Sequence, residues 1–119
     1  MQNPQKNLYK KFLGRIGERK ACKYLKKLKY KIIQTNYVTP YGEADIIAIK
    51  DNELYFIEVK TRSNEKFGRP AEAVDYKKQE RYKQIASYYL LANKLEDVNI
   101  SFSVIEILKN DVNLIKNAF

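Results

Sequence analysis

Three residues in the middle of the chain have side chains suited to acid–base and metal chemistry: Asp45, Glu58 and Lys60. Glu58 and Lys60 are two residues apart, so in a β-strand their side chains share a face, about 6.6 Å apart along the strand. Asp45 stands near the start of the preceding apolar segment, and a hairpin brings the start of one strand beside the end of the other. We therefore expect two carboxylates and one ammonium to converge at one edge of a sheet.

Two convergent carboxylates are suited to Mg²⁺ or Mn²⁺, which prefer oxygen ligands and keep several bound waters. We predict that Asp45 and Glu58 bind the cation and that the backbone carbonyl of Val59 is a further ligand. Such a cation polarises a phosphate and lowers the pKa of a bound water. Lys60 would then orient the attacking water or stabilise the transition state.

A simpler interpretation is that Glu58 and Lys60 form a solvent-facing ion pair, worth roughly 0.2–1 kcal/mol. Residues 54–57 are continuously apolar, which is typical of a central strand covered on both sides. Charges at the end of such a strand need a partner or a function. This context favours the site over the simple ion pair.

The composition excludes several other kinds of site. The chain has 119 residues, 45% of them hydrophobic, no histidine and a single cysteine. It therefore has no residues for a Cys/His zinc site, a Ser-His-Asp triad or an internal disulfide. Neither a signal-peptide pattern nor an apolar run of roughly 18 residues is present, so we predict one cytoplasmic domain over residues 1–119 with no membrane contact. Cys22, among apolar neighbours, is expected to be buried and inert.

The net charge of +9 is concentrated at one end of the chain. Residues 1–31 contain eleven basic residues and one acid, for a charge of +10, whereas the remainder carries −1. Such a segment is typical of a surface that binds nucleic-acid phosphates, with DNA the expected partner and RNA the alternative. A solvated helix face or an anionic lipid surface are the other interpretations. The predicted contacts are Lys10, Lys11, Arg15 and Arg19 in this segment, and Arg62 and Arg69 after Lys60.

Hydrophobic periodicity predicts an α/β fold with the order α-β-β-β-α-β-β, a mixed sheet flanked by helices. The third strand should pair in parallel with the strand after the second helix. Gly14 and Gly17 lie inside the first helix and are predicted to allow close backbone approach, the alternative being a break into two helices. The expected elements are a helix over 5–28, strands over 30–38, 44–49 and 54–59, a helix from Pro70 or Ala71 to Asn93, and strands over 99–108 and 112–115.

Asp45 and Glu58-Val59-Lys60, separated by a gap of 13 residues, resemble the signature of the PD-(D/E)xK phosphodiesterase superfamily, and the gap is similar to that of archaeal Holliday-junction resolvases. From about Gly14 onward the chain resembles the small bacterial YraN-type family. The elements that carry this resemblance are Gly14 to Glu18, Asn36, Gly42 to Ile47, Phe56 to Arg62, Lys78-Gln79, and Asn117-Ala118-Phe119.

The resemblance implies a restriction-endonuclease-like fold and a Mg²⁺- or Mn²⁺-dependent nuclease site acting on DNA, including branched DNA. It assigns Glu18 as a further metal or water ligand, although a lone acid among cations is also a natural salt-bridge partner. We assign the Lys78-Gln79 element to nucleic-acid binding. A symmetric junction substrate would favour a homodimer. The alternative function is a non-catalytic nucleic-acid-binding module on the same fold.

One departure from the family pattern concerns the strand after the second helix. Family members often have an acidic residue there, whereas this chain has Ser101-Phe102-Ser103. The role of that strand is therefore left open by the resemblance.

Overall fold

The computed structural model describes residues 4–62 and 75–119, with side chains from Lys11 onward apart from that of Phe12. Its elements follow the predicted order α-β-β-β-α-β-β, and the fold is α/β and compatible with a restriction-endonuclease-like fold. They are α1 (Pro4–Lys27), β1 (Lys31–Thr39), β2 (Gly42–Lys50), β3 (Glu53–Arg62), α2 (Tyr76–Ala92), β4 (Asn99–Leu108) and β5 (Asp111–Ile115).

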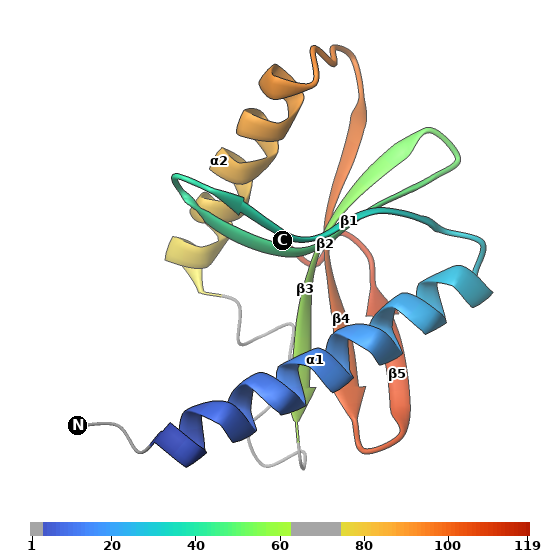
Figure 1. The fold of residues 1–119 in the computed structure, drawn as a ribbon. Helices are drawn as coiled ribbons and strands as arrows, with labels where there is room; N and C mark the ends of the chain where they lie inside the picture. The colour runs from blue at the N-terminus through green and yellow to red at the C-terminus, as the bar shows by residue number, and fades with distance from the viewer. Residues whose placement is uncertain (1–3, 63–74) are drawn as a thin grey trace.

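The five strands form one mixed sheet in the order β1-β2-β3-β4-β5 (Figure 1). All neighbouring strands are antiparallel except β3 and β4, which are parallel and pair along their whole length, from Glu53 opposite Asn99 to Arg62 opposite Leu108. The predicted parallel pairing is thus confirmed. Because parallel neighbours need a crossover connection, the chain that contains α2 must pass over one face of the sheet.

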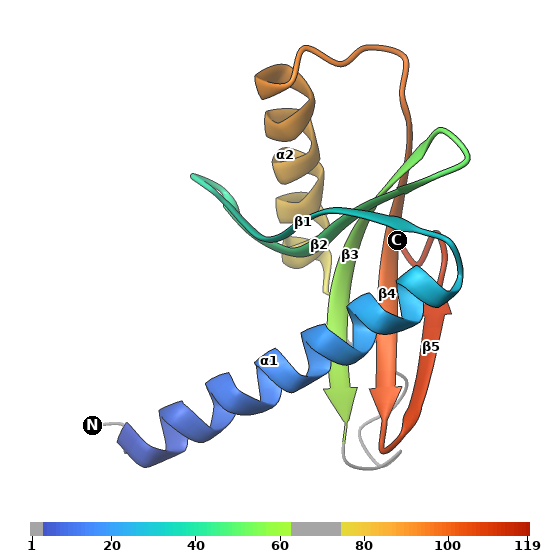
Figure 2. The same cartoon turned by 45° about the vertical axis from the view of Figure 1, so that its right-hand side comes forward.

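The two helices cover opposite faces of the sheet. Figures 1 and 2 show α1 running obliquely across β3, β4 and β5, with α2 on the other side. Successive residues of β3 alternate between the two cores: Phe56 packs with Tyr82, Ile85 and Tyr89 of α2, whereas Ile57 packs with Leu25 of α1. Since side chains alternate along a strand, Glu58 and Lys60 lie on the α2 face.

Helix α2 begins later than the sequence predicted. Asp75 has an extended backbone, with φ −76° and ψ 171°, and its carboxylate accepts a hydrogen bond from the backbone N–H of Lys78 at 2.8 Å. Asp75 is therefore the N-cap, and Tyr76 is the first helical residue. The predicted start at Pro70 or Ala71 is wrong because the capping carboxylate decides the boundary; residues 70–74 themselves lie outside the described part.

The first helix and the hairpins agree closely with prediction. Helix α1 is continuous from Pro4 to Lys27, so the alternative of two shorter helices is wrong. Asp51 and Asn52 both have positive φ angles, 50° and 64°, as expected for a two-residue turn between β2 and β3.

In the described part of the chain, neither helix combines the length and the apolar character needed to cross a membrane.

The two glycines of α1 have different surroundings. A Cβ atom on Gly17 would lie 2.7 Å from Oγ1 of Thr61 and 3.8 Å from side-chain carbons of Val59 and Ile107. A Cβ on Gly14 would meet nothing within 4 Å. The prediction of close approach is therefore confirmed for Gly17, where α1 lies against the end of β3, and wrong for Gly14.

This difference predicts opposite effects of alanine on stability. Gly14→Ala should raise the free energy of unfolding by about 0.5–1 kcal/mol, because alanine favours the helix and meets no clash. Gly17→Ala should instead lower it by about 1 kcal/mol, since overpacking costs more than the helix gains. Urea denaturation measures both, and Thr61→Ala added to Gly17→Ala should recover most of the loss. Equal effects at the two positions would contradict the packing of α1 on β3.

Candidate functional site

The site is built where β2 separates from β3. Pairing between these strands runs from Lys50 and Glu53 to Ile46 and Ile57 and then stops. Asp45 and Glu58 stand one position further along, facing each other across the separating strands. The two carboxylates therefore meet in the interior of the sheet, between its second and third strands, and not at a sheet edge as the sequence suggested.

Each carboxylate of this pair has hydrogen-bond donors around it. Oδ2 of Asp45 accepts a hydrogen bond from the backbone N–H of Val59 at 2.8 Å. Glu58 is buried, and its Oε1 forms ion pairs with the ammonium groups of Lys60, at 3.5 Å, and of Lys78. Its Oε2 accepts a hydrogen bond of 2.5 Å from the hydroxyl of Tyr82. Glu58 thus lies near both Asp45 and Lys60, as predicted, and α2 supplies two additional partners.

Tyr82 is the site residue that the sequence analysis missed. Its side chain is fully buried under α2, and its hydroxyl also lies 3.5 Å from the backbone nitrogen of Asp45. It lies four residues after Lys78, so both side chains are on the same helix face as Ile85 and Tyr89. That apolar stripe marks Tyr82 as buried, and a buried tyrosine hydroxyl needs a partner. The sequence does not reveal that this partner is Glu58.

The end of the chain supports Tyr82 from the other side. The ring of Phe119 stacks on Phe102 with centroids 5.5 Å apart and meets the ring of Tyr82 edge to face at 5.6 Å. The backbone N–H of Ala118 donates to the carbonyl of Phe102 at 2.8 Å, which holds this segment against β4. The Asn-Ala-Phe element of the resemblance therefore packs against the tyrosine that holds Glu58.

The two serines of β4, where the resemblance led us to expect an acidic residue, are buried. Ser101 and Ser103 share a hydrogen bond of 2.7 Å, and Oγ of Ser101 also accepts one from the backbone N–H of Asn117 at 3.2 Å. They bond to each other and to the C-terminal segment, so β4 contributes packing to this site.

Burial and like charge shift the protonation of this cluster. Burial, followed by the negative charge of Glu58, raises the pKa of Asp45 to about 7, although the Val59 N–H opposes the rise. Burial, together with the nearby positive charge of Lys78, lowers the pKa of Lys60. Burial also acts to lower the pKa of Lys78, but the hydrogen bond and charge of Glu58 outweigh it, so that this pKa is raised. Burial and the neighbouring Glu58 therefore make the ionised form of Asp45 costly in this site.

Asp45 and Glu58 fit a divalent cation by chemistry and by charge. Both supply carboxylate oxygens. Burial and then the negative charge of Glu58 raise the pKa of Asp45, and a cation between the two carboxylates would offset the repulsion between them. In residues 4–62 and 75–119, however, no group of three or more acidic or cysteine residues is close enough to hold a metal. The backbone N–H of Val59 is used by Asp45, and the role of its carbonyl stays a prediction.

Glu18 lies near the Asp45–Glu58 pair, but in the described part of the chain it does not form a three-carboxylate metal site with them. Its Oε2 accepts a hydrogen bond from the side-chain amide of Asn36 in β1 at 2.9 Å. Its charge nevertheless contributes to the raised pKa of Asp45, so the two carboxylates are within electrostatic range. Asn36 also belongs to the elements that carry the resemblance, and the structure shows that its partner is Glu18.

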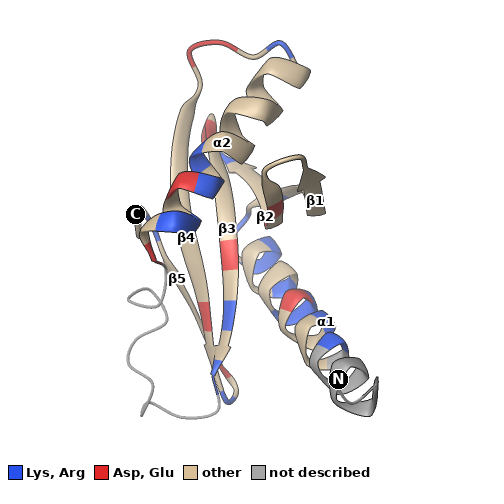
Figure 3. Cartoon of the chain, turned by 90° about the vertical axis from the view of Figure 1, so that its left-hand side faces the viewer, with Lys and Arg blue, Asp and Glu red and all other residues tan. Residues whose placement is uncertain are grey.

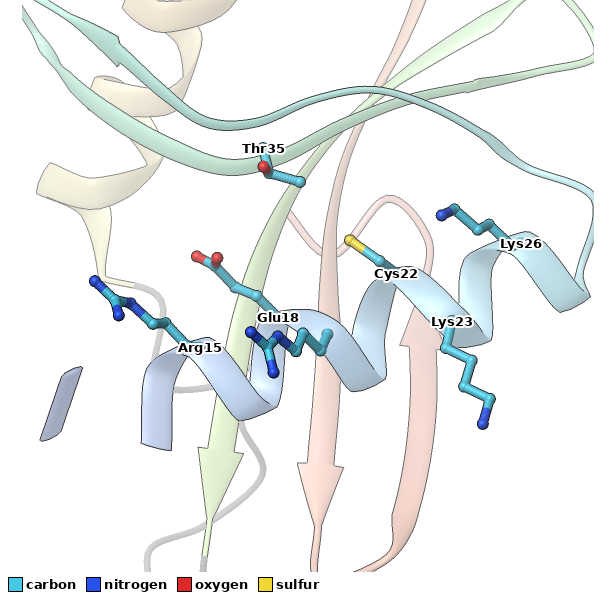
Figure 4. Close-up of a pocket in the computed structure, with 7 residues that line it drawn as sticks. Arg15, Glu18, Cys22, Lys23, Lys26 and Thr35 are labelled. Carbon is cyan, nitrogen blue, oxygen red and sulfur yellow. The ribbon is translucent and has the colours of Figure 1, made fainter. Parts of the chain in front are cut away.

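A basic groove lies between α1 and β1, next to Glu18. It has a volume of about 380 Å³ and is visible in Figure 4, where Glu18, Cys22 and Lys26 extend from α1 on the side facing Thr35. Cys22 is therefore only partly buried, contrary to expectation, and partial burial raises the pKa of its thiol. The residues that line the groove are Arg15, Glu18, Arg19, Cys22, Lys23, Lys26 and Thr35.

The predicted nucleic-acid contacts are dispersed over the molecule. Lys11 is exposed on α1, whereas Lys78 pairs with Glu58 and Gln79 is partly buried on α2. The buried Nε of Arg62 has no hydrogen-bond partner within the described residues. Figure 3, which shows the α2 side, places charged positions on both α2 and β3. The side chain of Lys10, and Arg69 as a whole, lie outside the description.

The raised pKa of Asp45 predicts how stability depends on pH. The ordinary pKa is 3.8 and the value in the fold is about 7, so between them the folded protein keeps a proton that the unfolded chain releases. This contribution to stability is complete below about pH 4 and is lost as the pH rises through about 7. In EDTA, the gain in free energy of unfolding from Asp45→Asn should therefore increase by on the order of 2 kcal/mol between pH 4 and pH 8.

Urea denaturation at several pH values measures this gain, with Asp111→Asn on the exposed part of β5 as the matched control. A gain that does not change with pH would show that Asp45 has an ordinary pKa in the fold.

Comparison with known proteins agrees with the resemblance seen in the sequence. A UPF0102 protein of Alkaliphilus oremlandii is 46% identical over 115 residues, covering 92% of this chain and 98% of its own length. One of Caldicellulosiruptor saccharolyticus is 43% identical over 116 residues, with the same coverage, and one of Clostridioides difficile is 45% identical over 108 residues, covering 89% of this chain and 95% of its own. Residues 17–107 match the group described as "Uncharacterised protein family UPF0102", which is the YraN family, and the chain belongs to it.

Proposed function

We propose that this protein is a divalent-cation-dependent endonuclease that cleaves DNA phosphodiester bonds at the Asp45–Glu58 pair. The observation that carries the proposal is the placement of these two carboxylates opposite each other where β2 leaves β3, with the ammonium of Lys60 3.5 Å from Glu58. Two neighbouring carboxylates are costly to bury, and a bound Mg²⁺ or Mn²⁺ would offset this cost.

The chain's own residues have defined tasks in this proposal. The Val59 N–H holds one oxygen of Asp45, and the Tyr82 hydroxyl holds one oxygen of Glu58, so the two carboxylates keep a fixed orientation. When bound, the cation would supply Lewis acidity and a water of lowered pKa. Lys60, partly buried and close to Glu58, would donate a hydrogen bond to the attacking water or to the phosphate oxygens in the transition state.

Substrate binding is assigned to the basic groove and to the end of β3. Arg15, Arg19 and Lys23 follow one another at intervals of four residues, so they form a row about 6 Å apart along α1. Glu18 in the same groove is within electrostatic range of Asp45, which supports a path for a phosphate backbone from the groove to the site. Arg62, the last residue of β3, supplies a guanidinium group of the kind that binds phosphate.

The activity predicts cleavage that depends on both the cation and Asp45. The wild-type protein should cut at least one of labelled duplex, single-stranded, flap and four-way-junction DNA in Mg²⁺ or Mn²⁺, and EDTA should abolish the reaction. Asp45→Ala should reduce the rate roughly 100-fold or more, because an essential cation ligand is lost. The exposed carboxylate variant Asp111→Ala, purified in the same way, should cut like the wild type. Gel electrophoresis of the products also identifies the preferred substrate.

Two outcomes would contradict the nuclease proposal. Equal cleavage by wild type and Asp45→Ala would place the activity elsewhere or in a contaminant. Binding without cleavage under every condition would favour the nucleic-acid-binding module, for which the basic groove provides the surface. In that case log affinity should fall by about 0.9 per contacted phosphate for each log unit of salt.

A preference for four-way junctions would favour a homodimer, which analytical ultracentrifugation detects.

A further inference from the structure

The carboxylate of Glu58 is already neutralised by cations from the chain itself. Its Oε1 is shared by the ammonium groups of Lys60 and Lys78, and its Oε2 is held by Tyr82. Lys60 comes from the same strand as Glu58, whereas Lys78 reaches the site from the first turn of α2. The two ammonium groups therefore offset part of the negative charge that Asp45 and Glu58 bring to the site.

We propose that Lys78 is an internal counter-cation that occupies the position beside Glu58 where a divalent cation binds, so that Lys78 must leave Glu58 before the cation can take its place. This inference rests on the proposed function and adds a means of regulating the same site. It gives Lys78 a role in cation binding that is separate from the nucleic-acid contact expected from the sequence.

Lys78 and Tyr82 have different freedom to move, although both come from the same face of α2. The side chain of Tyr82 is 1% exposed, and its ring lies against Phe119, so it cannot leave Glu58 without disturbing the core. The side chain of Lys78 is 31% exposed and has a flexible four-carbon stem, so its ammonium can exchange the carboxylate for water. Tyr82 therefore holds Oε2 of Glu58 in place while Lys78 releases Oε1.

The charge of a bound divalent cation requires that Lys78 leave Glu58. A divalent cation added beside Asp45 and Glu58 would bring two positive charges next to the two ammonium groups, and like charges at such separations repel strongly in a partly buried site. Lys60 is attached to β3 two residues from Glu58 and stays nearby whatever happens to α2. Lys78 is the cation that can move away, because its backbone belongs to a different element.

The inference predicts that removing the Lys78 ammonium tightens cation binding. Lys78→Met keeps the apolar stem and should bind Mn²⁺ about tenfold more tightly than the wild type, because no internal cation competes for Glu58. In EDTA the same variant should melt at a lower temperature than the wild type, since Asp45 and Glu58 lose a counter-cation. Lys77→Met, the exposed neighbour on α2, is the matched control and should change neither value. Isothermal titration calorimetry and thermal unfolding, both without nucleic acid, measure these effects.

The possible results separate this inference from the proposed function. Equal or weaker Mn²⁺ binding by Lys78→Met would overturn the competition while leaving the cation site intact. Absence of Mn²⁺ binding by both wild type and variant would overturn the cation-dependent function and, with it, the role of Lys78.

A measurement on the wild-type protein keeps the test decisive if Lys78→Met does not fold. In protein labelled with ¹⁵N at lysine side chains, titration with Mg²⁺ should move the Lys78 ammonium signal toward the position of a solvated lysine. The signal of Lys83, which pairs with Glu80 on the exposed side of α2, should stay unchanged. A Lys78 signal that does not move at a saturating Mg²⁺ concentration would contradict the displacement.

Discussion

The repulsion between two carboxylates placed opposite each other explains most of the contacts around this site. Asp45 and Glu58 face each other because β2 and β3 remain in register up to Ile46 and Ile57 and then separate. Burial and this proximity raise the pKa of Asp45 to about 7. The surrounding groups all compensate negative charge: a backbone N–H from Val59, a hydroxyl from Tyr82, and ammonium groups from Lys60 and Lys78. Without them the pair would be too costly to bury.

The two helices supply different parts of the site because they cover different faces of the sheet. The parallel pairing of β3 with β4 requires a crossover, which places α2 on the face that carries Glu58 and lets its first turn reach the carboxylate. Helix α1 crosses the opposite face, where Gly17 allows close contact with Thr61, and it forms the basic groove with β1. The carboxylate pair and the groove thus lie on two sides of β2, connected electrostatically through Glu18.

Sequence patterns were sufficient for much of the fold. Alternating apolar residues predicted the strand boundaries within about three residues, and the neighbouring apolar segments over 44–49 and 54–59 predicted the hairpin that brings Asp45 near Glu58. The predicted start of α2 was wrong because Pro70 suggested a helix start, whereas the side chain of Asp75 caps the helix five residues later. Gly14 and Gly17 look alike in sequence, and only packing distinguishes them. Tyr82 was missed because its hydroxyl acts across 24 residues of sequence.

The sequence by itself determined the order of the elements, the concentration of positive charge in α1 and the spacing of Glu58 and Lys60 on one strand, because these properties depend on local periodicity and composition. Tertiary structure decided which groups meet. The point at which β2 parts from β3 places Asp45 opposite Glu58, the crossover brings Lys78 and Tyr82 to that carboxylate, and Asn36 holds Glu18 to one side. Such contacts join residues from separate elements, and their partners are set by strand register and helix docking, which periodicity along the chain does not encode.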